Sequence, residues 1–317
     1  MSASTQAKSS KSPAKPKSRP ARRPAGAKSS ARVVGGQVVR KPAKTGKSRA
    51  KKSSRRTAKT ADKYELYQLA VQSAETDVAF HRNVYKSLRG REPLHFREDF
   101  CGTGLLSSEW IQLSKHHTAE GFDIDPEPIA WGLAHNFDEL GEAAQRYTVH
   151  LKDVRSKGDV PADVRVAQNF SYYCLTTRTE LLEYFRAARA DLDDDGIFVI
   201  DLYGGSESND EMEESLRCSG FHYIWEQAEF FPGTGEYVCH IHFRFPDGTE
   251  MRRAFTYKWR QWYLTELRDI LADAGFSQVH NYFEGTEKDG VSGNGVFRRG
   301  RRGENCPAWI AYLVATK

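Results

Sequence analysis

Segments that read as strands alternate with segments that read as helices between residues 94 and 202, and this alternation constrains the fold most strongly. The strand-like segments are short, and the central ones, such as GIFVIDL at 196–202, are apolar almost throughout. Strands of that kind are typical of a parallel sheet covered by helices on both faces, so we expect an α/β fold. The expected strands are residues 94–100, 118–123, 147–151, 164–168 and 196–202, and the expected helices are residues 62–88, 105–114, 126–140 and 177–192.

The pattern changes after residue 202. Residues 221–257 alternate apolar and polar side chains and contain the turn signals Pro-Gly and Asp-Gly, which predicts a small antiparallel insert. The remaining elements are expected to be a helix at 262–274 and strands near 277–284 and 309–316, with a glycine-rich loop at 285–303 between the two strands.

The chain divides into a basic N-terminal segment and an acidic body. Residues 1–60 hold 19 Lys and Arg and no Asp or Glu, whereas residues 61–317 hold 28 basic and 42 acidic residues. The basic segment has too little apolar surface to offset its ordering entropy, so we expect residues 1–60 to be a disordered tail. Residues 61–317 are expected to form one domain. The tail would either contact nucleic acid non-specifically through phosphate charge or fold back on the acidic body.

Nothing in the sequence predicts insertion into a membrane. It has no run of 18 or more apolar residues, and no apolar stretch of the kind found in secretory signals follows the basic start. The five cysteines are scattered and lack Cys-x-x-Cys spacing, which favours a reducing compartment over a structural zinc site. We therefore expect a cytoplasmic protein without membrane contact and without a metal.

The turn after the first expected strand carries two glycines, Gly102 and Gly104, in REDFCGTG. In an α/β sheet this turn lies at the carboxyl edge, where ligands bind. Carboxylates surround it, because Glu98 precedes the turn, Asp123 ends the second strand and Asp153 follows the third. Three carboxylates would repel a pyrophosphate, but they suit a nucleoside that carries an amine and a sulfonium, both cationic.

Residues 94–317 resemble a class I S-adenosylmethionine-dependent methyltransferase of a bacterial type with undefined substrate. REDFCGTG resembles the first motif of this family, AEGFDIDPEPIAWG the second, LKDV the adenine-side motif, and NFSYY at 169–173 the motif after the fourth strand. The resemblance implies a Rossmann-like seven-stranded sheet with helices on both faces and a small antiparallel insert before the last helix. It also implies S-adenosyl-L-methionine as the cofactor and a role for residues 221–257 as a substrate lid.

The resemblance further implies roles for single residues around the methionine and ribose of the cofactor. Glu98 would hold the methionine amine, directly or through water. Gly102 and Gly104 would let the backbone approach the cofactor. Asp123 would bind the ribose, in preference to Asp125, which reads as the N-cap of the next helix.

On the adenine side, the resemblance implies that Asp153 accepts a hydrogen bond from the adenine amino group and that Val154 supplies a backbone contact. Phe100 departs from the family pattern, which has a glycine at this position. The departure implies either a backbone that needs no positive φ or a slightly reshaped turn.

No catalytic residue is assigned, but four side chains are candidates for the substrate side. Asn169 and Tyr172 have the Asn-x-x-Tyr spacing of enzymes that methylate amines in DNA and proteins, although this chain has Phe-Ser where those enzymes have Pro-Pro. His240 and His242 lie on the polar face of an expected strand, where a histidine can act as a base. Strand alternation explains the spacing of the two histidines better than a metal site does.

The sequence therefore predicts a methyltransferase whose acceptor is a small molecule. Three alternatives stay open: a nucleic-acid or protein methyltransferase tethered by the basic tail, a non-catalytic binding protein with a vestigial cofactor site, and an NAD-dependent oxidoreductase. Glu98 argues against the last of these. So does Ser107, which stands where a dinucleotide fingerprint has its third glycine.

Overall fold

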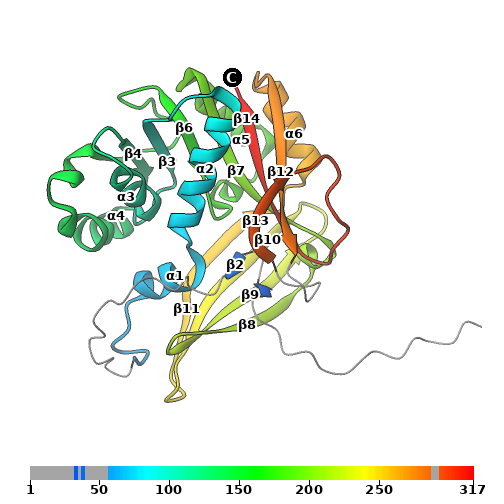
Figure 1. Cartoon of the computed structure of the whole chain (residues 1–317). Helices are drawn as coiled ribbons and strands as arrows, with labels where there is room; N and C mark the ends of the chain where they lie inside the picture. The colour runs from blue at the N-terminus through cyan, green and yellow to red at the C-terminus, as the bar shows by residue number, and fades with distance from the viewer. Residues whose placement is uncertain (1–31, 35–36, 40–55, 287–292) are drawn as a thin grey trace, which may run out of the picture.

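The computed structural model describes residues 32–34, 37–39, 56–286 and 293–317 (Figure 1). Its largest part is an eight-stranded sheet with helices on both faces, and a four-stranded antiparallel sheet extends from one end of it. The α/β class, the Rossmann-like arrangement and the antiparallel insert are therefore confirmed.

Five parallel strands form the half of the main sheet that carries the predicted site. Their order is β7-β6-β3-β4-β5, and each pairs with its neighbour in parallel. Beyond β7 the sheet continues with β14 and then β12, the last two predicted strands. Both are antiparallel to their neighbours. The bounds are β3 His95–Asp99, β4 Thr118–Asp123, β5 Tyr147–Leu151, β6 Ala162–Ala167, β7 Leu192–Gly204, β12 Gln278–Thr286 and β14 Trp309–Thr316.

Helices cover the two faces of this sheet around two separate hydrophobic cores. On one face, Trp110 stacks on Phe96 with 4.7 Å between ring centroids, and on the other face Phe276 stacks on Phe198 at 5.8 Å. Both faces of β3, β6 and the second half of β7 are thus buried, which explains the nearly continuous apolar sequence of β7. The helices are α1 Lys63–Val71, α2 Ala74–Arg89, α3 Leu105–Gln112, α4 Pro126–Gly132, α5 Arg178–Ala190 and α6 Leu264–Asp273.

Two of the predicted helices are not continuous. The helix expected at 62–88 is divided, because Gln72 is extended and Ser73 begins a new helix, so that α1 and α2 point in different directions (Figure 1). The helix expected at 126–140 keeps α-helical geometry only through α4. A π turn and a 3-10 helix follow it, and Gly141 breaks the latter with a φ of 56°.

The insert between β7 and α6 has four strands in the order β11-β10-β9-β8. The three strands predicted within 221–257 are β9 Phe221–Phe231, β10 Glu236–Arg244 and β11 Glu250–Arg260, and β8 Met212–Cys218 was not predicted. Tyr237, Cys239 and Ile241 share the buried face of β10, as the alternation predicts. This face joins the core that also contains α5 and α6.

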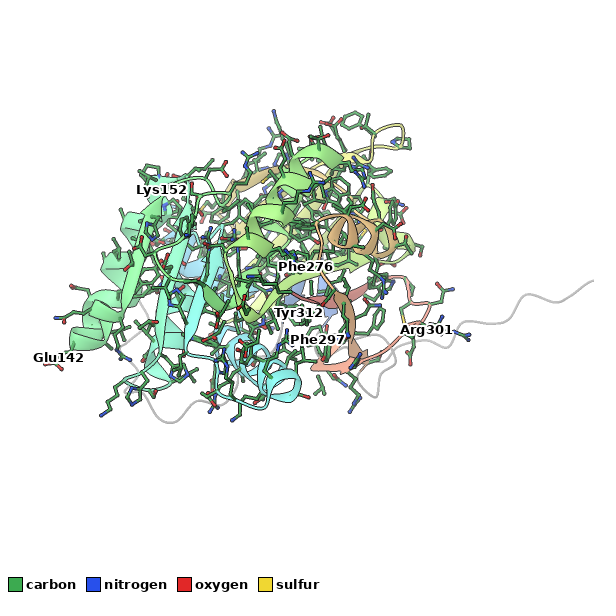
Figure 2. All side chains as sticks on the ribbon, turned by 90° about the horizontal axis from the view of Figure 1, so that it is seen from above. Glu142, Lys152, Phe276, Phe297, Arg301 and Tyr312 are labelled. Atoms are coloured by element: carbon green, nitrogen blue, oxygen red, sulfur yellow. The ribbon has the colours of Figure 1, made fainter. Side chains whose placement is uncertain are left out.

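The main sheet has one strand more than the seven predicted. Residues 285–303 were expected to form a loop, but Gly293–Arg299 pair with β12 as an edge strand, β13. Phe297 of this strand packs on Tyr312 with 4.4 Å between ring centroids (Figure 2). Gly293 and Gly295 hid the strand in the sequence, whereas packing on the neighbouring aromatic residues stabilises it in the fold.

Most of the predicted tail, residues 1–60, lies outside the described residues. Within it, β1 Arg32–Val34 and β2 Gln37–Val39 form an antiparallel hairpin that was not predicted. Residues 56–58 belong to the folded body, since Arg56 donates to the carbonyl of Ser219 and the N–H of Ala58 donates to Thr249 Oγ1 at 3.0 Å. Across the described residues, no helix combines the length and the apolar character needed to cross a membrane.

Candidate functional site

A cavity of about 250 Å³ lies at the carboxyl ends of β3, β4 and β6. The glycine-containing turn forms one wall, and α1 together with β11 of the insert covers it. Figure 1 shows α1 at the junction between the main sheet and the insert. The lining residues are Lys63, Tyr64, Tyr67, Gln72, Glu98, Asp99, Phe100, Cys101, Gly102, Thr103, Asp123, Asp125, Pro128, Gln168, Asn169, Ser171 and Phe255. The structure therefore brings Glu98, Gly102, Asp123 and Asn169 together.

The turn between β3 and α3 has three residues with left-handed backbone. Gly102 and Gly104 have φ values of 51° and 65°, and Phe100 has a φ of 52°. Of the two alternatives for Phe100, a backbone without positive φ is wrong, because this residue occupies the strained conformation that a glycine adopts freely. Its ring packs edge-on against Tyr184 at 5.7 Å. The side chain thus gains packing in a position where the backbone is strained.

The two glycines have different functions in the turn. Gly102 borders the cavity, and a Cβ added to it would meet no atom within 4 Å. Gly104 does not line the cavity, and a Cβ there would lie 2.8 Å from the hydroxyl of Tyr147. The structure therefore places Gly102 where a ligand can approach the backbone. Gly104 instead permits close packing behind the turn.

Glu98 is buried at the end of β3, with 4% of its surface exposed. Its Oε2 accepts hydrogen bonds from the N–H of Ser107 at 2.9 Å and from the hydroxyl of Ser107 at 2.6 Å. Burial outweighs these bonds and raises the pKa of Glu98 to about 7. Ser107 thus has a role that the sequence did not reveal: it ties this carboxylate to the first turn of α3.

Asp123 ends β4 and is bonded to the glycine turn. Its Oδ2 accepts from the N–H of Gly102 at 2.8 Å, and its Oδ1 accepts from the N–H of Asp125 at 2.9 Å. Burial raises the pKa of Asp123. Asp125 is the N-cap of α4, as predicted, since it accepts from the N–H of Glu127 at 2.9 Å. Ile124 between them is 73% exposed and presents apolar surface beside Asp123. The sequence interpretation did not single out this residue.

Asp153 and Val154 lie outside the cavity, in the loop that follows β5. Arg155 binds the Asp153 carboxylate through Nε at 2.8 Å and Nη2 at 2.6 Å, and this hydrogen bonding lowers the pKa of Asp153. The N–H of Lys152 donates to the carbonyl of Asp123 at 2.9 Å, so the loop begins next to Asp123. The N–H of Val154 has no hydrogen-bond partner among the described residues.

The substrate-side candidates Asn169 and Tyr172 are separated by the structure. Asn169 lines the cavity, whereas Tyr172 is fully buried and its hydroxyl donates to the carbonyl of Asp201 at 2.7 Å. Asn169 and Phe170 are both left-handed, with φ values of 57° and 56°. The Asp201 carboxylate holds them by accepting the N–H of Asn169 at 2.7 Å and that of Phe170 at 2.9 Å. Asp201 was not singled out from the sequence.

His240 and His242 do not line the cavity. They lie on the face of the insert opposite to Phe255, which is a cavity residue paired with Ile241. His240 Nδ1 lies 2.9 Å from Thr256 Oγ1, and His242 Nε2 lies 2.8 Å from Glu226 Oε2. Both imidazoles are buried in contacts within the insert, so the geometry does not place them beside a ligand in the cavity.

Helix α1 connects the two sides of the cavity. Towards the glycine turn, the Gln68 amide donates to Thr103 Oγ1 at 2.9 Å, and Trp131 Nε1 donates to Asp62 at the start of the helix at 2.9 Å. Towards the insert, the rings of Tyr64 and Tyr67 contact Phe255 with centroid distances of 5.8 and 5.1 Å. The helix therefore closes the cavity on the side away from the sheet.

Comparison with known proteins gives matches among solved structures. No protein-family model matches the sequence, and no curated protein matches it. An S-adenosylmethionine-dependent methyltransferase from Clostridium acetobutylicum superimposes with a TM-score of 0.57 at 16% identity, over 80% of this chain and 96% of that one. An amino pentose methyltransferase of calicheamicin biosynthesis from Micromonospora echinaspora gives 0.57 at 16% identity, over 81% and 97%.

A third match is a sugar N-methyltransferase from Streptoalloteichus, with a TM-score of 0.53 at 15% identity over 86% of this chain and 98% of that one. The superpositions cover nearly the whole length of each of these structures. The chain therefore has the fold of the S-adenosylmethionine-dependent methyltransferases.

Proposed function

We propose that this chain is an S-adenosylmethionine-dependent methyltransferase that transfers a methyl group to a small molecule. The observation that supports it most is the convergence of Glu98, Gly102 and Asp123 on one cavity at the carboxyl edge of the parallel sheet. Burial raises the pKa of both carboxylates, and a ligand that brings positive charge favours their ionised forms.

The residues around the cavity fit this cofactor. The open space at Gly102 lets a ligand approach the backbone, and the exposed Ile124 beside Asp123 offers apolar surface to a base. Among the described residues that line the cavity, Lys63 is the only Lys or Arg, and it pairs with Glu127 at 2.8 Å. A pyrophosphate would therefore find carboxylates instead of cations, which disfavours a dinucleotide.

The protein side of the mechanism consists of orientation and exclusion of water. The bound cofactor supplies a methyl group that its sulfonium makes reactive. Glu98 and Asp123 are the groups that would hold the amine and the ribose. Asn169 lines the cavity and would lie on the acceptor side, and α1 with Phe255 covers one side of the cavity. Alignment and exclusion of water are enough for an amine that arrives deprotonated, so we assign no catalytic base.

The proposed acceptor is a small molecule, with the insert as its lid. The small size of the cavity and its cover of α1 and β11 support this choice over a duplex or a folded protein. Two of the structural neighbours are sugar methyltransferases by name. For the N-terminal residues 1–60 we keep the proposal of a non-specific contact with nucleic acid through charge. A cytoplasmic location remains a proposal as well.

Calorimetry on the full chain tests the cofactor. S-adenosylhomocysteine, the product form of the cofactor, is expected to bind with a micromolar dissociation constant, and NAD is expected not to compete with it. Absence of heat at high micromolar S-adenosylhomocysteine would contradict the proposal and would favour a binding protein with a vestigial site. Displacement by NAD would instead favour the oxidoreductase.

A further inference from the structure

Two arginines lie completely buried beneath the loop that carries Asp153 and Val154. Arg97 of β3 and Arg165 of β6 are register partners in neighbouring parallel strands, and neither side chain is exposed. Arg97 Nη2 donates to the carbonyl of Val154 at 2.7 Å, and Arg165 Nη2 donates to the same carbonyl at 2.6 Å. Arg97 Nη2 also reaches the carbonyl of Ser156 at 3.0 Å. The two guanidinium groups thus fix the inner side of this loop.

The charge of the arginines is balanced by two buried aspartates. Asp99 lies between the arginines and accepts from Arg97 Nε at 2.9 Å and from Arg165 Nε at 2.6 Å. Asp191 accepts from Arg97 Nη1. Because Asp99 also lines the cavity, the network extends from the cavity wall to the loop.

The far end of the same loop is held by buried acids. The N–H of Gly158 lies 3.2 Å from both carboxylate oxygens of Asp191. Glu120 of β4 accepts from the N–H of Asp159 at 3.0 Å and from that of Val160 at 3.1 Å. A Cβ at Gly158 would lie 2.8 Å from Glu120 and 3.1 Å from Asp191, so a larger residue here would displace these carboxylates from the loop.

Burial of these charges is not explained by stability alone. Apolar side chains at the interior of a parallel sheet would avoid the desolvation of four ionised groups, and replacing buried ion pairs in this way is often neutral or stabilising. These charged groups share one target, which is the backbone of a single loop. Together with Glu120, these groups bind backbone atoms at five positions of one loop, between Val154 and Val160. That loop follows Lys152, whose N–H donates to the carbonyl of Asp123.

We propose that Arg97 and Arg165 are positioning residues that hold residues 153–160 as the adenine-side wall of the cofactor site. The carbonyl of Val154 is bonded to both guanidinium groups, and its N–H has no hydrogen-bond partner among the described residues. The start of the loop is held beside Asp123 through the N–H of Lys152. A preorganised loop binds a base without paying the entropy of ordering itself. This inference rests on the proposed cofactor.

The test compares variants of the full chain by calorimetry with S-adenosylhomocysteine and with adenosine, well below their melting temperatures. In R165K one ammonium cannot donate to Asp99 and to Val154 in the geometry of a guanidinium. We expect the dissociation constants of both ligands to rise by about tenfold, since adenosine keeps the part that the loop would contact. G158A keeps all the charges and should give the same loss of affinity. It replaces R165K as the test variant if R165K does not fold.

The matched control is R91K. It alters an arginine outside the network, which binds Asp163 and Asp195 near the amino ends of the strands. It is expected to lower the melting temperature and to leave both dissociation constants within about twofold of wild type. Hydrogen exchange should be faster for the peptide covering residues 152–160 in R165K and unchanged there in R91K.

The outcomes separate the inference from the proposed function. If the wild-type protein does not bind S-adenosylhomocysteine, both the cofactor and the inference are overturned. If the wild type binds it and R165K and G158A bind it equally well, only the inference is overturned. Unchanged exchange of residues 152–160 in R165K would also overturn the inference, because the arginines would then not hold the loop.

Discussion

At the scale of single residues, the cavity is surrounded by groups held in unfavourable states. Phe100 and Asn169, which line it, have left-handed backbones although neither is glycine, and Phe170 next to Asn169 does too. Burial raises the pKa of Glu98 and of Asp201 to about 7. Strained backbone and raised carboxylate pKa values cluster at functional sites, because a ligand can offset their cost.

Glu98 should make cofactor binding depend on pH. Without ligand its pKa is about 7, so below neutral pH the carboxylate is mostly protonated and must lose the proton to hold an ammonium group. Affinity for S-adenosylhomocysteine should therefore rise with pH, by roughly tenfold between about pH 6 and about pH 7.5. Calorimetry across this range checks it. E98Q should bind more weakly and without this dependence, whereas a flat profile for wild type would exclude Glu98 as the amine ligand.

Asp201 should make the folded state less stable as pH rises. Its carboxyl keeps a proton in the folded state up to about pH 7, while the unfolded chain releases it near the ordinary value of 3.8. Between these values the folded state binds more protons, so the free energy of unfolding falls with rising pH. In D201N this fall should be less steep by about 1.4 kcal/mol per pH unit.

Urea unfolding of wild type and D201N at several values between pH 5 and 6.5, all about one unit or more above 3.8, measures the difference in slope. Glu98 adds a slope of the same sign in both proteins, so only the difference belongs to Asp201. Equal slopes would mean that Asp201 is already ionised in the folded protein at pH 5. The Asn169–Phe170 turn would then be held by a full negative charge throughout.

At the scale of elements, the division between α1 and α2 matters most for the site. The sequence predicted one helix at 62–88, because both parts have helical periodicity. What separates them is the extended Gln72. The break frees α1 to leave the main sheet and contact both the cofactor turn and the insert. Such tertiary contacts override local propensity, which is why residue patterns alone did not locate the break between the two helices.

The contact of α1 with the glycine-turn side of the cavity can be tested at Asp62, the N-cap of the helix. Asp62 caps the helix by accepting from the N–H groups of Tyr64 and Glu65, and it also accepts from Trp131 Nε1. D62A should lower the free energy of unfolding by about 1 kcal/mol. It should also speed the dissociation of S-adenosylhomocysteine several-fold, because it loosens the helix from the cofactor side of the cavity.

T177A is the matched control for this variant. Thr177 caps α5 in a capping box and does not line the cavity, so its loss should cost a similar amount of stability. Surface plasmon resonance of both variants measures the dissociation rates of S-adenosylhomocysteine. A rate that is equal in D62A and T177A would show that α1 does not retain the ligand.

At the scale of the whole molecule, the sequence was informative where structure follows from periodicity and uninformative where it follows from contacts. The bounds of β4 and β5 match the prediction residue for residue. The glycine turn and Asp123 were also found at the cavity. The strand β13, the roles of Ser107 and Asp201, and the Arg97–Arg165 network depend on partners distant in sequence, which one sequence does not reveal.

The opposite charges of the two parts of the chain give a prediction at this scale. Every residue that lines the cavity lies at or after Lys63, and the described N-terminal residues that contact the insert, in β1 and at Arg56 and Ala58, all lie after residue 31. Deleting residues 1–31 removes eight Lys and Arg and no cavity residue. The dissociation constant of S-adenosylhomocysteine should stay the same, and the free energy of unfolding should change by less than about 0.5 kcal/mol.

Affinity for a single-stranded oligonucleotide should fall in this deletion, and the slope of log affinity against log salt should become less steep, because fewer counterions are released. A full-length variant with these eight residues changed to Gln separates charge from chain length, and it should behave like the deletion. If the oligonucleotide binds all three proteins equally, the contact does not involve the N-terminal charge. If the deletion instead weakens the binding of S-adenosylhomocysteine, residues 1–31 take part in the cofactor site. The division of the chain into a charged segment and a body that binds the ligand by itself would then be wrong.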